Sequence, residues 1–156
     1  MAQNFNKIMV VCVGNICRSP VGERLLRQRL GDAGITVTSA GIGALVGHEA
    51  DPTATEVAAE NGLSLAGHSA RQFTGELAAD QDLILVLEPG HRRAIGESNP
   101  QLMGKVMLFD QWVGARGIAD PHRKSKTFHE LVYKELVAAA DAWAQKLAPN
   151  PAANRR

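Results

Sequence analysis

The order of apolar and polar positions along the chain predicts alternating strands and helices. Four runs of apolar or β-branched residues have the length and pattern of strands, and the segments between them hold helical patterns. The run at residues 82–87 is almost continuously apolar, which is typical of a central strand covered on both faces. The predicted strands are residues 7–12, 35–39, 82–87 and 105–109.

Helices are predicted from apolar stripes at helical spacing and from the turn residues that bound them. Asp51-Pro52 marks one helix start, with Asp51 as its cap, and Ser19 is a candidate N-cap for the first helix. Residues 149–156 are predicted to be a flexible tail. The predicted helices are residues 19–31, 51–61, a short helix within 69–80, then 89–98 and 127–147.

This alternation predicts a single α/β domain, residues 1–148, in which helices flank a central four-stranded parallel sheet in three layers. The first strand, helix and second strand imply a parallel, right-handed unit. Ligands of such sheets bind at the carboxyl ends of the strands. The segment directly after the first strand is therefore the first place to look for a functional site.

Composition and charge exclude several classes of protein. The chain has 156 residues, 45% hydrophobic and 21% charged, as in an ordinary globular domain. A formal charge of +1 argues against a nucleic-acid partner. No apolar run approaches the roughly 20 residues of a membrane span, and the first residues lack the layout of a signal peptide. These features predict a monomeric cytoplasmic protein that does not insert into membranes.

The cysteine and histidine content gives no sign of a metal site. The two cysteines, Cys12 and Cys17, are a poor disulfide framework and lack a second pair for structural zinc. Four of the histidines are expected on the surface, with no metal cluster among them: His48, His91, His122 and His129. No cofactor is predicted.

The stretch that joins the first strand to the first helix carries the candidate chemistry. It reads Cys12-Val13-Gly14-Asn15-Ile16-Cys17-Arg18-Ser19-Pro20. A loop between a strand and a helix start points backbone N–H groups and the positive end of the helix dipole at one place, which suits an anion. Arg18 adds a planar cation that matches phosphate oxygens, and the same field stabilises a thiolate at Cys12. The loop from Val13 to Arg18 therefore predicts a phosphate site with a nucleophile at its floor.

Cys12, five intervening residues and Arg18-Ser19-Pro20 resemble the signature loop of the low-molecular-weight protein tyrosine phosphatases, and Asp120-Pro121 matches the acid motif of that family. The resemblance covers nearly the whole chain and points to the bacterial branch associated with exopolysaccharide and capsule. It implies hydrolysis of phosphotyrosine through a phosphocysteine on Cys12. Arg18 would bind the phosphate, and Asp120 would act as general acid and then general base.

The resemblance also implies supporting residues around this loop. Asn15 would shape the loop through side-chain hydrogen bonds, and the hydroxyl of Ser19 would face the sulfur of the nucleophile. Ser39 and His68 fall where the family places partners of the loop asparagine. Cys17, in the same loop, is a candidate resolving thiol that would pair with the nucleophile on oxidation.

Leu45 and His122 are expected to form the wall that sets specificity. The animal branch lines its cleft with large aromatic side chains, whereas an apolar slot at Leu45 still suits a phenyl ring. The segments 41–47 and 109–112 resemble bacterial members paired with tyrosine autokinases of polysaccharide export. The resemblance therefore implies that the substrate is a phosphotyrosine protein, and it points to the tail of a membrane tyrosine autokinase.

Two alternatives stay open at this point. Protein-arginine phosphatases share the loop but typically carry threonine where this chain has Ile16, which favours phosphotyrosine. The other alternative is a non-catalytic phosphate-binding or redox-sensing module, although Cys12, Arg18 and Asp120 are all present. Related arsenate reductases need further cysteines downstream, which this chain lacks.

Overall fold

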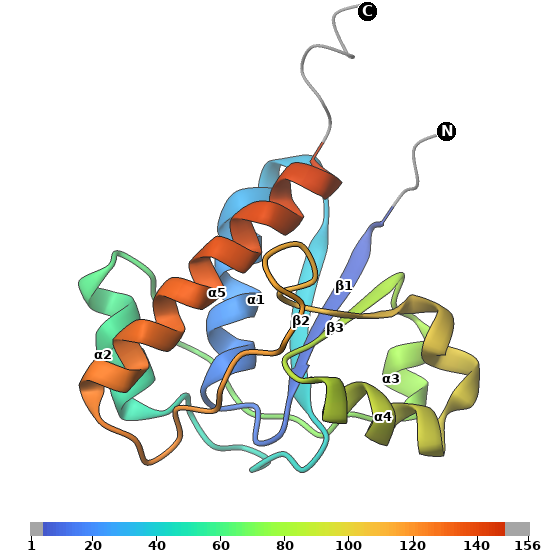
Figure 1. Ribbon diagram of the computed structural model, residues 1–156, viewed down its shortest axis with the longest axis horizontal. Coiled ribbons are helices and arrows are strands. Elements are labelled where there is room, and N and C mark those ends of the chain that lie inside the picture. The colour runs from blue at the N-terminus through green and yellow to red at the C-terminus, as the bar shows by residue number, and fades with distance from the viewer. Residues whose placement is uncertain (1–4, 149–156) are drawn as a thin grey trace, which may run out of the picture.

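The computed structural model describes residues 5–148 and confirms the predicted three-layer α/β fold (Figure 1). Four parallel strands form one sheet in the order β2-β1-β3-β4. The strands are β1 (Lys7–Cys12), β2 (Thr36–Gly41), β3 (Leu83–Val86) and β4 (Val106–Leu108). The α-helices are α1 (Arg18–Leu30), α2 (Pro52–Glu60), α3 (Gly75–Ala79), α4 (Pro89–Ser98) and α5 (Lys126–Leu147), and short 3-10 helices span Gly31–Ala33 and Pro100–Lys105.

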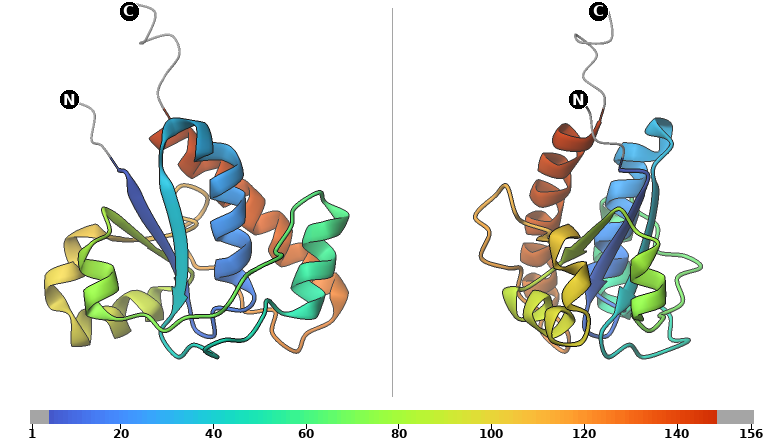
Figure 2. Two further views of the ribbon diagram at one scale, coloured as in Figure 1. Left: turned by 180° about the vertical axis from the view of Figure 1, so that it is seen from behind. Right: turned by 90° about the vertical axis from the view of Figure 1, so that its right-hand side faces the viewer.

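The side chains of β1 explain why both faces of the sheet are covered. Ile8 and Val10 point into a core shared with α1, α2 and α5, whereas Met9 and Val11 point into a core shared with α3 and α4. All four side chains are fully buried. Figure 2 shows the same arrangement, with the two groups of helices on opposite sides of the strands. Alternation along one buried strand therefore produces the three layers.

The order of the strands determines where in the sheet a ligand site is expected. The chain passes from β1 to β2 on one side and later returns to β3 on the other, so the carboxyl ends of β1 and β3 flank a switch point. Such a switch point is where open α/β sheets bind ligands. Cys12 ends β1, and Glu88 follows β3 by two residues. Both therefore lie at the edge of the sheet where a ligand is expected.

Most element boundaries agree with the sequence to within one or two residues, but one predicted cap is wrong. Helix α1 begins at Arg18, and Cys17 takes the N-cap position without a side-chain hydrogen bond. Ser19 is not the N-cap, because its hydroxyl is engaged inside the loop described below. The predicted cap at Asp51 is confirmed, since its Oδ2 accepts from the backbone N–H of Ala54 at 3.0 Å.

Helix α5 is fixed to the last strand by its tryptophan. Trp143 Nε1 donates to the carbonyl of Leu108 at 3.2 Å, and its ring meets that of Trp112 edge to face at 5.4 Å. Between residues 5 and 148 no helix has both the length and the apolar character needed to cross a membrane. The predicted tail at residues 149–156 lies outside the described residues.

Candidate active site

The loop that follows β1 is built around Asn15. Its backbone has a positive φ of 60°, which asparagine tolerates better than most residues with a side chain. The buried side chain donates from Nδ2 to Ser19 Oγ at 2.8 Å and Ser39 Oγ at 3.0 Å, and Oδ1 accepts from the N–H of Arg71 at 2.9 Å. His68 Nε2 lies 2.6 Å from the carbonyl oxygen of Asn15. The structure therefore brings all three predicted supporting residues around this asparagine.

Further residues that hold the loop were not predicted. Ser39 Oγ donates to the buried Glu23 at 2.8 Å, and Arg71 Nε donates to the carbonyl of Ser39 at 3.0 Å. Gly41 leaves no room for a side chain, because a Cβ there would lie 2.3 Å from the carbonyl oxygen of Val13. A glycine at a strand end was a visible signal for such a close approach. Glu23 and Arg71 carried no signal of their own, since their partners lie far away in the sequence.

Replacing Asn15 with alanine is expected to impair catalysis while the fold persists. The change leaves buried partners unsatisfied, at about 1–3 kcal/mol for such a group, and strains the backbone at positive φ. We expect kcat/KM for an aryl phosphate to fall on the order of 10²-fold, because small displacements of reacting groups have effects of that size. Steady-state kinetics and circular dichroism check this.

The matched control for this variant is Asn61→Ala. Asn61 is exposed at the end of α2, and its side-chain amide is likewise hydrogen-bonded, since Nδ2 donates to the backbone carbonyl of Val57 at 2.8 Å. We expect its kcat/KM to stay within about twofold of the parent. Comparable losses in both variants would contradict the role assigned to Asn15.

Cys12 and Ser19 form a buried pair at the floor of the loop. Cys12 Sγ lies 2.8 Å from Ser19 Oγ. Because this hydroxyl oxygen already accepts a hydrogen bond from Asn15 Nδ2, its own proton is free to point at the sulfur. A hydrogen bond donated to sulfur stabilises negative charge there. The arrangement suits a thiolate nucleophile.

Arg18 is 1% exposed, and one side of its guanidinium group is anchored. Nη1 donates to Glu88 Oε2 at 2.5 Å and to the carbonyl of Ile118 at 2.7 Å. Nη2 lies 3.7 Å from Asp120 Oδ2, and Nε has no hydrogen-bond partner among the residues that the structure describes. Nε and Nη2 share one edge of the guanidinium group, which is the two-pronged edge that binds phosphate oxygens. That edge remains available to an anion.

Glu88 is a site residue that sequence reasoning missed, although its place just after a central strand was a signal. Besides anchoring Arg18, its Oε2 lies 3.6 Å from His91 Nε2. Burial, and then the charge of Arg18, lower the pKa of His91. The expectation that His91 and His129 are surface residues is wrong, because they are only 5% and 4% exposed. Both side chains face the packed interior next to the site instead of solvent.

A small pocket of about 190 Å³ opens above the sulfur and collects most of the predicted site residues. The loop after β1, the 43–45 segment and the segment with Asp120 and His122 line it together. Asp120 is half exposed, and its Oδ1 accepts from the backbone N–H of His122 at 3.0 Å. The lining residues are Cys12, Val13, Gly14, Ile16, Cys17, Arg18, Gly43, Leu45, Asp120 and His122.

Cys17 differs from Cys12 in its surroundings, although both are free thiols. Burial raises the pKa of Cys17, and the carboxylates of Asp51 and Asp120 raise it further. Cys17 is therefore a protonated thiol at neutral pH. Its role as a resolving thiol stays a prediction.

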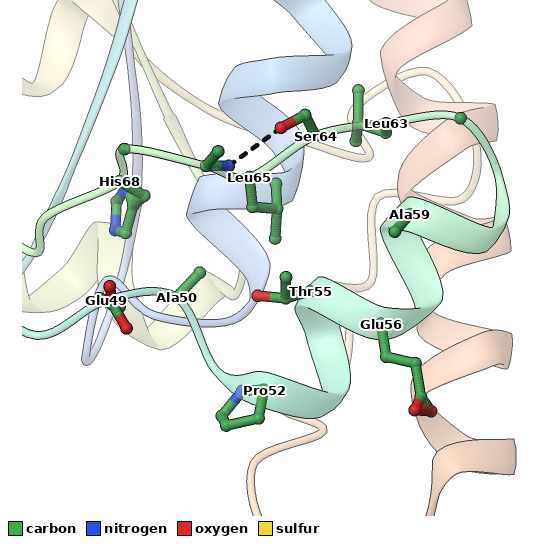
Figure 3. Close-up of a pocket in the computed structure, with 13 residues that line it drawn as sticks. Glu49, Ala50, Pro52, Thr55, Glu56, Ala59, Leu63, Ser64, Leu65 and His68 are labelled. Atoms are coloured by element: carbon green, nitrogen blue, oxygen red, sulfur yellow. Dashed lines mark hydrogen bonds between the residues drawn. The ribbon is translucent and has the colours of Figure 1, made fainter.

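A larger cavity of about 680 Å³ lies beside α2 and does not hold the candidate nucleophile (Figure 3). Pro52, Thr55 and Glu56 of α2 line one part of it, and the segment at residues 62–68 lines another. His68 links it to the active-site loop, because its Nε2 lies 2.6 Å from the carbonyl oxygen of Asn15. The smaller pocket is the candidate active site, because it holds the sulfur, the arginine and the carboxylate together.

Comparisons with known proteins agree with this geometry. The family model for low molecular weight phosphotyrosine protein phosphatase matches residues 7–153. The low molecular weight protein-tyrosine-phosphatase Etp of Escherichia coli (strain K12) is 51% identical over 148 residues, which cover 94% of this chain and 99% of Etp. The corresponding enzyme Wzb of Salmonella typhimurium is 51% identical over 143 residues, which cover 92% of this chain and 95% of Wzb.

Solved structures extend the comparison. Wzb of Vibrio vulnificus in complex with benzylphosphonate has 49% sequence identity and a TM-score of 0.89, covering 92% of this chain and all of that one. The YwlE arginine phosphatase of Geobacillus stearothermophilus has 32% identity and a TM-score of 0.86, covering 92% of this chain and 93% of that one. The fold is therefore shared by enzymes of two specificities, and sequence identity is higher to the tyrosine phosphatase.

Proposed function

Because the chain belongs to the low molecular weight phosphotyrosine protein phosphatase family, we propose that it hydrolyses phosphotyrosine through a covalent phosphocysteine on Cys12. The chain is a protein-tyrosine phosphatase, as are its curated relatives. The observation that carries the proposed mechanism is the pocket in which Cys12, Arg18 and Asp120 meet. Each of these three residues has a separate chemical task.

Cys12 is the proposed nucleophile. Its thiolate attacks phosphorus, a sulfur–phosphorus bond forms and the bond from phosphorus to the phenolic oxygen breaks. Water then attacks the phosphocysteine, which releases inorganic phosphate and restores the thiolate. Support comes from the position of Sγ at the floor of the loop and from the Ser19 hydroxyl 2.8 Å away.

Arg18 is proposed to bind the phosphoryl oxygens through Nε and Nη2. Anchoring of Nη1 by Glu88 and the carbonyl of Ile118 fixes the plane of the guanidinium group before substrate arrives. Preorganised donors of this kind stabilise charge that develops on the transferring group without further rearrangement. Glu88 is thus a positioning residue that acts through Arg18.

Asp120 is proposed to donate a proton to the leaving phenolic oxygen and then to take one from the attacking water. Its carboxyl group lines the pocket and is half exposed, so that solvent reaches it for the second step. The turn formed with the N–H of His122 holds the side chain at the rim.

The walls of the pocket favour an aromatic substrate. Ile16 in the loop and Leu45 beside it are apolar side chains that line the pocket, and a phenyl ring packs on such a surface. Benzylphosphonate, bound in Wzb of Vibrio vulnificus, likewise joins a phenyl ring to a phosphonate. Phosphoarginine is the second candidate substrate, since an arginine phosphatase shares the fold at 32% identity.

The physiological substrate is proposed to be the phosphotyrosine-rich tail of a membrane tyrosine autokinase that serves polysaccharide export. The support is the resemblance of the segments 41–47 and 109–112 to bacterial members of the family that are paired with such kinases. We also propose that the enzyme acts in the cytoplasm, where its two free thiols stay reduced. A monomeric state stays a prediction from the sequence.

Matched phosphotyrosine and phosphoarginine peptides test the specificity directly. We expect kcat/KM to favour phosphotyrosine by at least about tenfold, which corresponds to roughly 1.4 kcal/mol in the transition state. The assay is phosphate release in buffer treated with a chelator, with Cys12→Ser as a blank for each peptide. A preference for phosphoarginine would overturn the substrate assignment and leave the thiol mechanism standing.

A further inference from the structure

Three side chains with metal-binding atoms meet beside the active-site pocket. Cys17 comes from the phosphate loop, Asp51 from the start of α2 and His122 from the segment after Asp120. Their sulfur, carboxylate oxygen and imidazole nitrogen atoms all lie within 4.8 Å of one another. The sequence gives no sign of this cluster, because the three residues are far apart along the chain. We propose that they form a binding site for Zn²⁺.

The geometry is close to what zinc requires. With bonds of about 2.3 Å to sulfur and about 2.0–2.2 Å to nitrogen or oxygen, tetrahedral donors lie roughly 3.3–3.7 Å apart. His122 Nδ1 is 4.0 Å from Asp51 Oδ1, and no two of the three donor atoms are more than 4.8 Å apart, so a movement of about 1 Å brings them to this spacing. His122 is 40% exposed and lies on a loop, where its ring is free to make that movement.

The carboxylate of Asp51 has one oxygen for the metal. Oδ2 is engaged, because it accepts from the N–H of Ala54 and lies 3.9 Å from His129 Nε2. Oδ1 faces His122 and can bind a cation while the helix cap persists. Asp51 is also tied to the phosphate loop, since its N–H donates to the carbonyl of Ile16 at 2.8 Å. The ligand from α2 is therefore already fixed beside the loop that carries Cys17.

The donor set and the local charge favour zinc over other common cations. One sulfur, one imidazole nitrogen and one carboxylate oxygen suit Zn²⁺, whereas Mg²⁺ and Ca²⁺ prefer oxygen alone. Asp51 and Asp120 place two carboxylates close to Cys17, and the cluster itself contains Asp51. When zinc binds, the S–H bond breaks, the proton passes to solvent and a sulfur–zinc bond forms without electron transfer.

Zinc at this place would join two parts of the active site. Cys17 belongs to the phosphate loop, and His122 follows Asp120 by two residues, so the cation would link the loop to the segment that carries the proposed acid. A water molecule would fill the fourth position, as in zinc sites with three protein ligands. The metal site does not depend on the proposed phosphatase mechanism, and its test needs no turnover.

Isothermal titration of the tag-free Cys12→Ser protein with Zn²⁺ tests the site. This background removes the other thiol, so that binding at the nucleophile cannot contribute. We expect one zinc per chain, and adding His122→Asn should weaken binding at least about tenfold, given that loss of even an outer partner costs 10–100-fold. Adding His48→Asn, a change at another exposed histidine, should leave the affinity unchanged.

Cobalt spectroscopy then identifies the sulfur ligand. Co²⁺ bound to a thiolate gives a charge-transfer band in the near ultraviolet, which we expect in the Cys12→Ser protein and not in Cys17→Ser. A band that survives in Cys17→Ser and is lost in Cys12→Ser would place the metal on the nucleophile and overturn the proposal. So would the absence of zinc binding, or equal affinity in the His122→Asn and His48→Asn proteins.

Discussion

Replacing Cys12 with serine is expected to lower kcat for a phosphotyrosine peptide by at least about 10⁴-fold, the scale seen when an enzyme loses its nucleophile. A serine hydroxyl is rarely ionised at neutral pH and is therefore a far weaker nucleophile than a thiolate. Affinity for inorganic phosphate should persist, because Arg18 and the backbone N–H groups of the loop are untouched. Steady-state kinetics and phosphate titration measure the two properties separately.

Trapping of the phosphoenzyme shows which thiol carries the phosphoryl group. Rapid acid quench with a labelled aryl phosphate should yield a phosphocysteine in the parent and in Cys17→Ser, and none in Cys12→Ser. Circular dichroism confirms that each variant is folded. A phosphocysteine that forms in Cys12→Ser, or wild-type turnover in that variant, would exclude the proposed nucleophile.

Replacing Asp120 with asparagine is expected to reduce activity in proportion to the basicity of the leaving group. For phenyl phosphate, whose leaving oxygen needs a proton, kcat/KM should fall about 10²–10⁴-fold. For an aryl phosphate with an acidic phenol the loss should be much smaller, since that oxygen departs as an anion. The ratio kcat/KM is the right measure, because it reports formation of the phosphocysteine and not its later hydrolysis.

Asp32→Asn is the matched control for the acid. Asp32 is exposed on the short 3-10 helix after α1 and takes no part in the pocket, so both substrates should be hydrolysed at the parental rate. An Asp120→Asn enzyme that lost activity equally toward both substrates would place the proton donor on another residue. His122, at the same rim, would then be the next candidate.

The fold could be predicted from the local pattern of apolar, polar and turn residues in the sequence. The apolar run that follows Lys7 in β1, the long amphipathic α5 and the turn at Asp51-Pro52 are patterns among neighbouring residues. Their secondary structure can therefore be predicted without knowing what they pack against. The strand–loop–helix at Cys12 to Arg18 is equally local, which is why its anion-binding geometry could be anticipated. The catalytic roles of this loop and of Asp120 stay predictions, which the experiments described above test.

By itself, then, the sequence determined the layers of the fold and the loop after β1, and it predicted which side chains of that loop react. Only the tertiary structure decided which groups surround the side chains of the loop. Glu88 holds Arg18, and Ser39 and Arg71 bind Asn15. Cys17 lies beside Asp51 and His122. These contacts join residues that are tens of positions apart. Such a contact depends on how several elements pack at once, and no short stretch of chain carries that information.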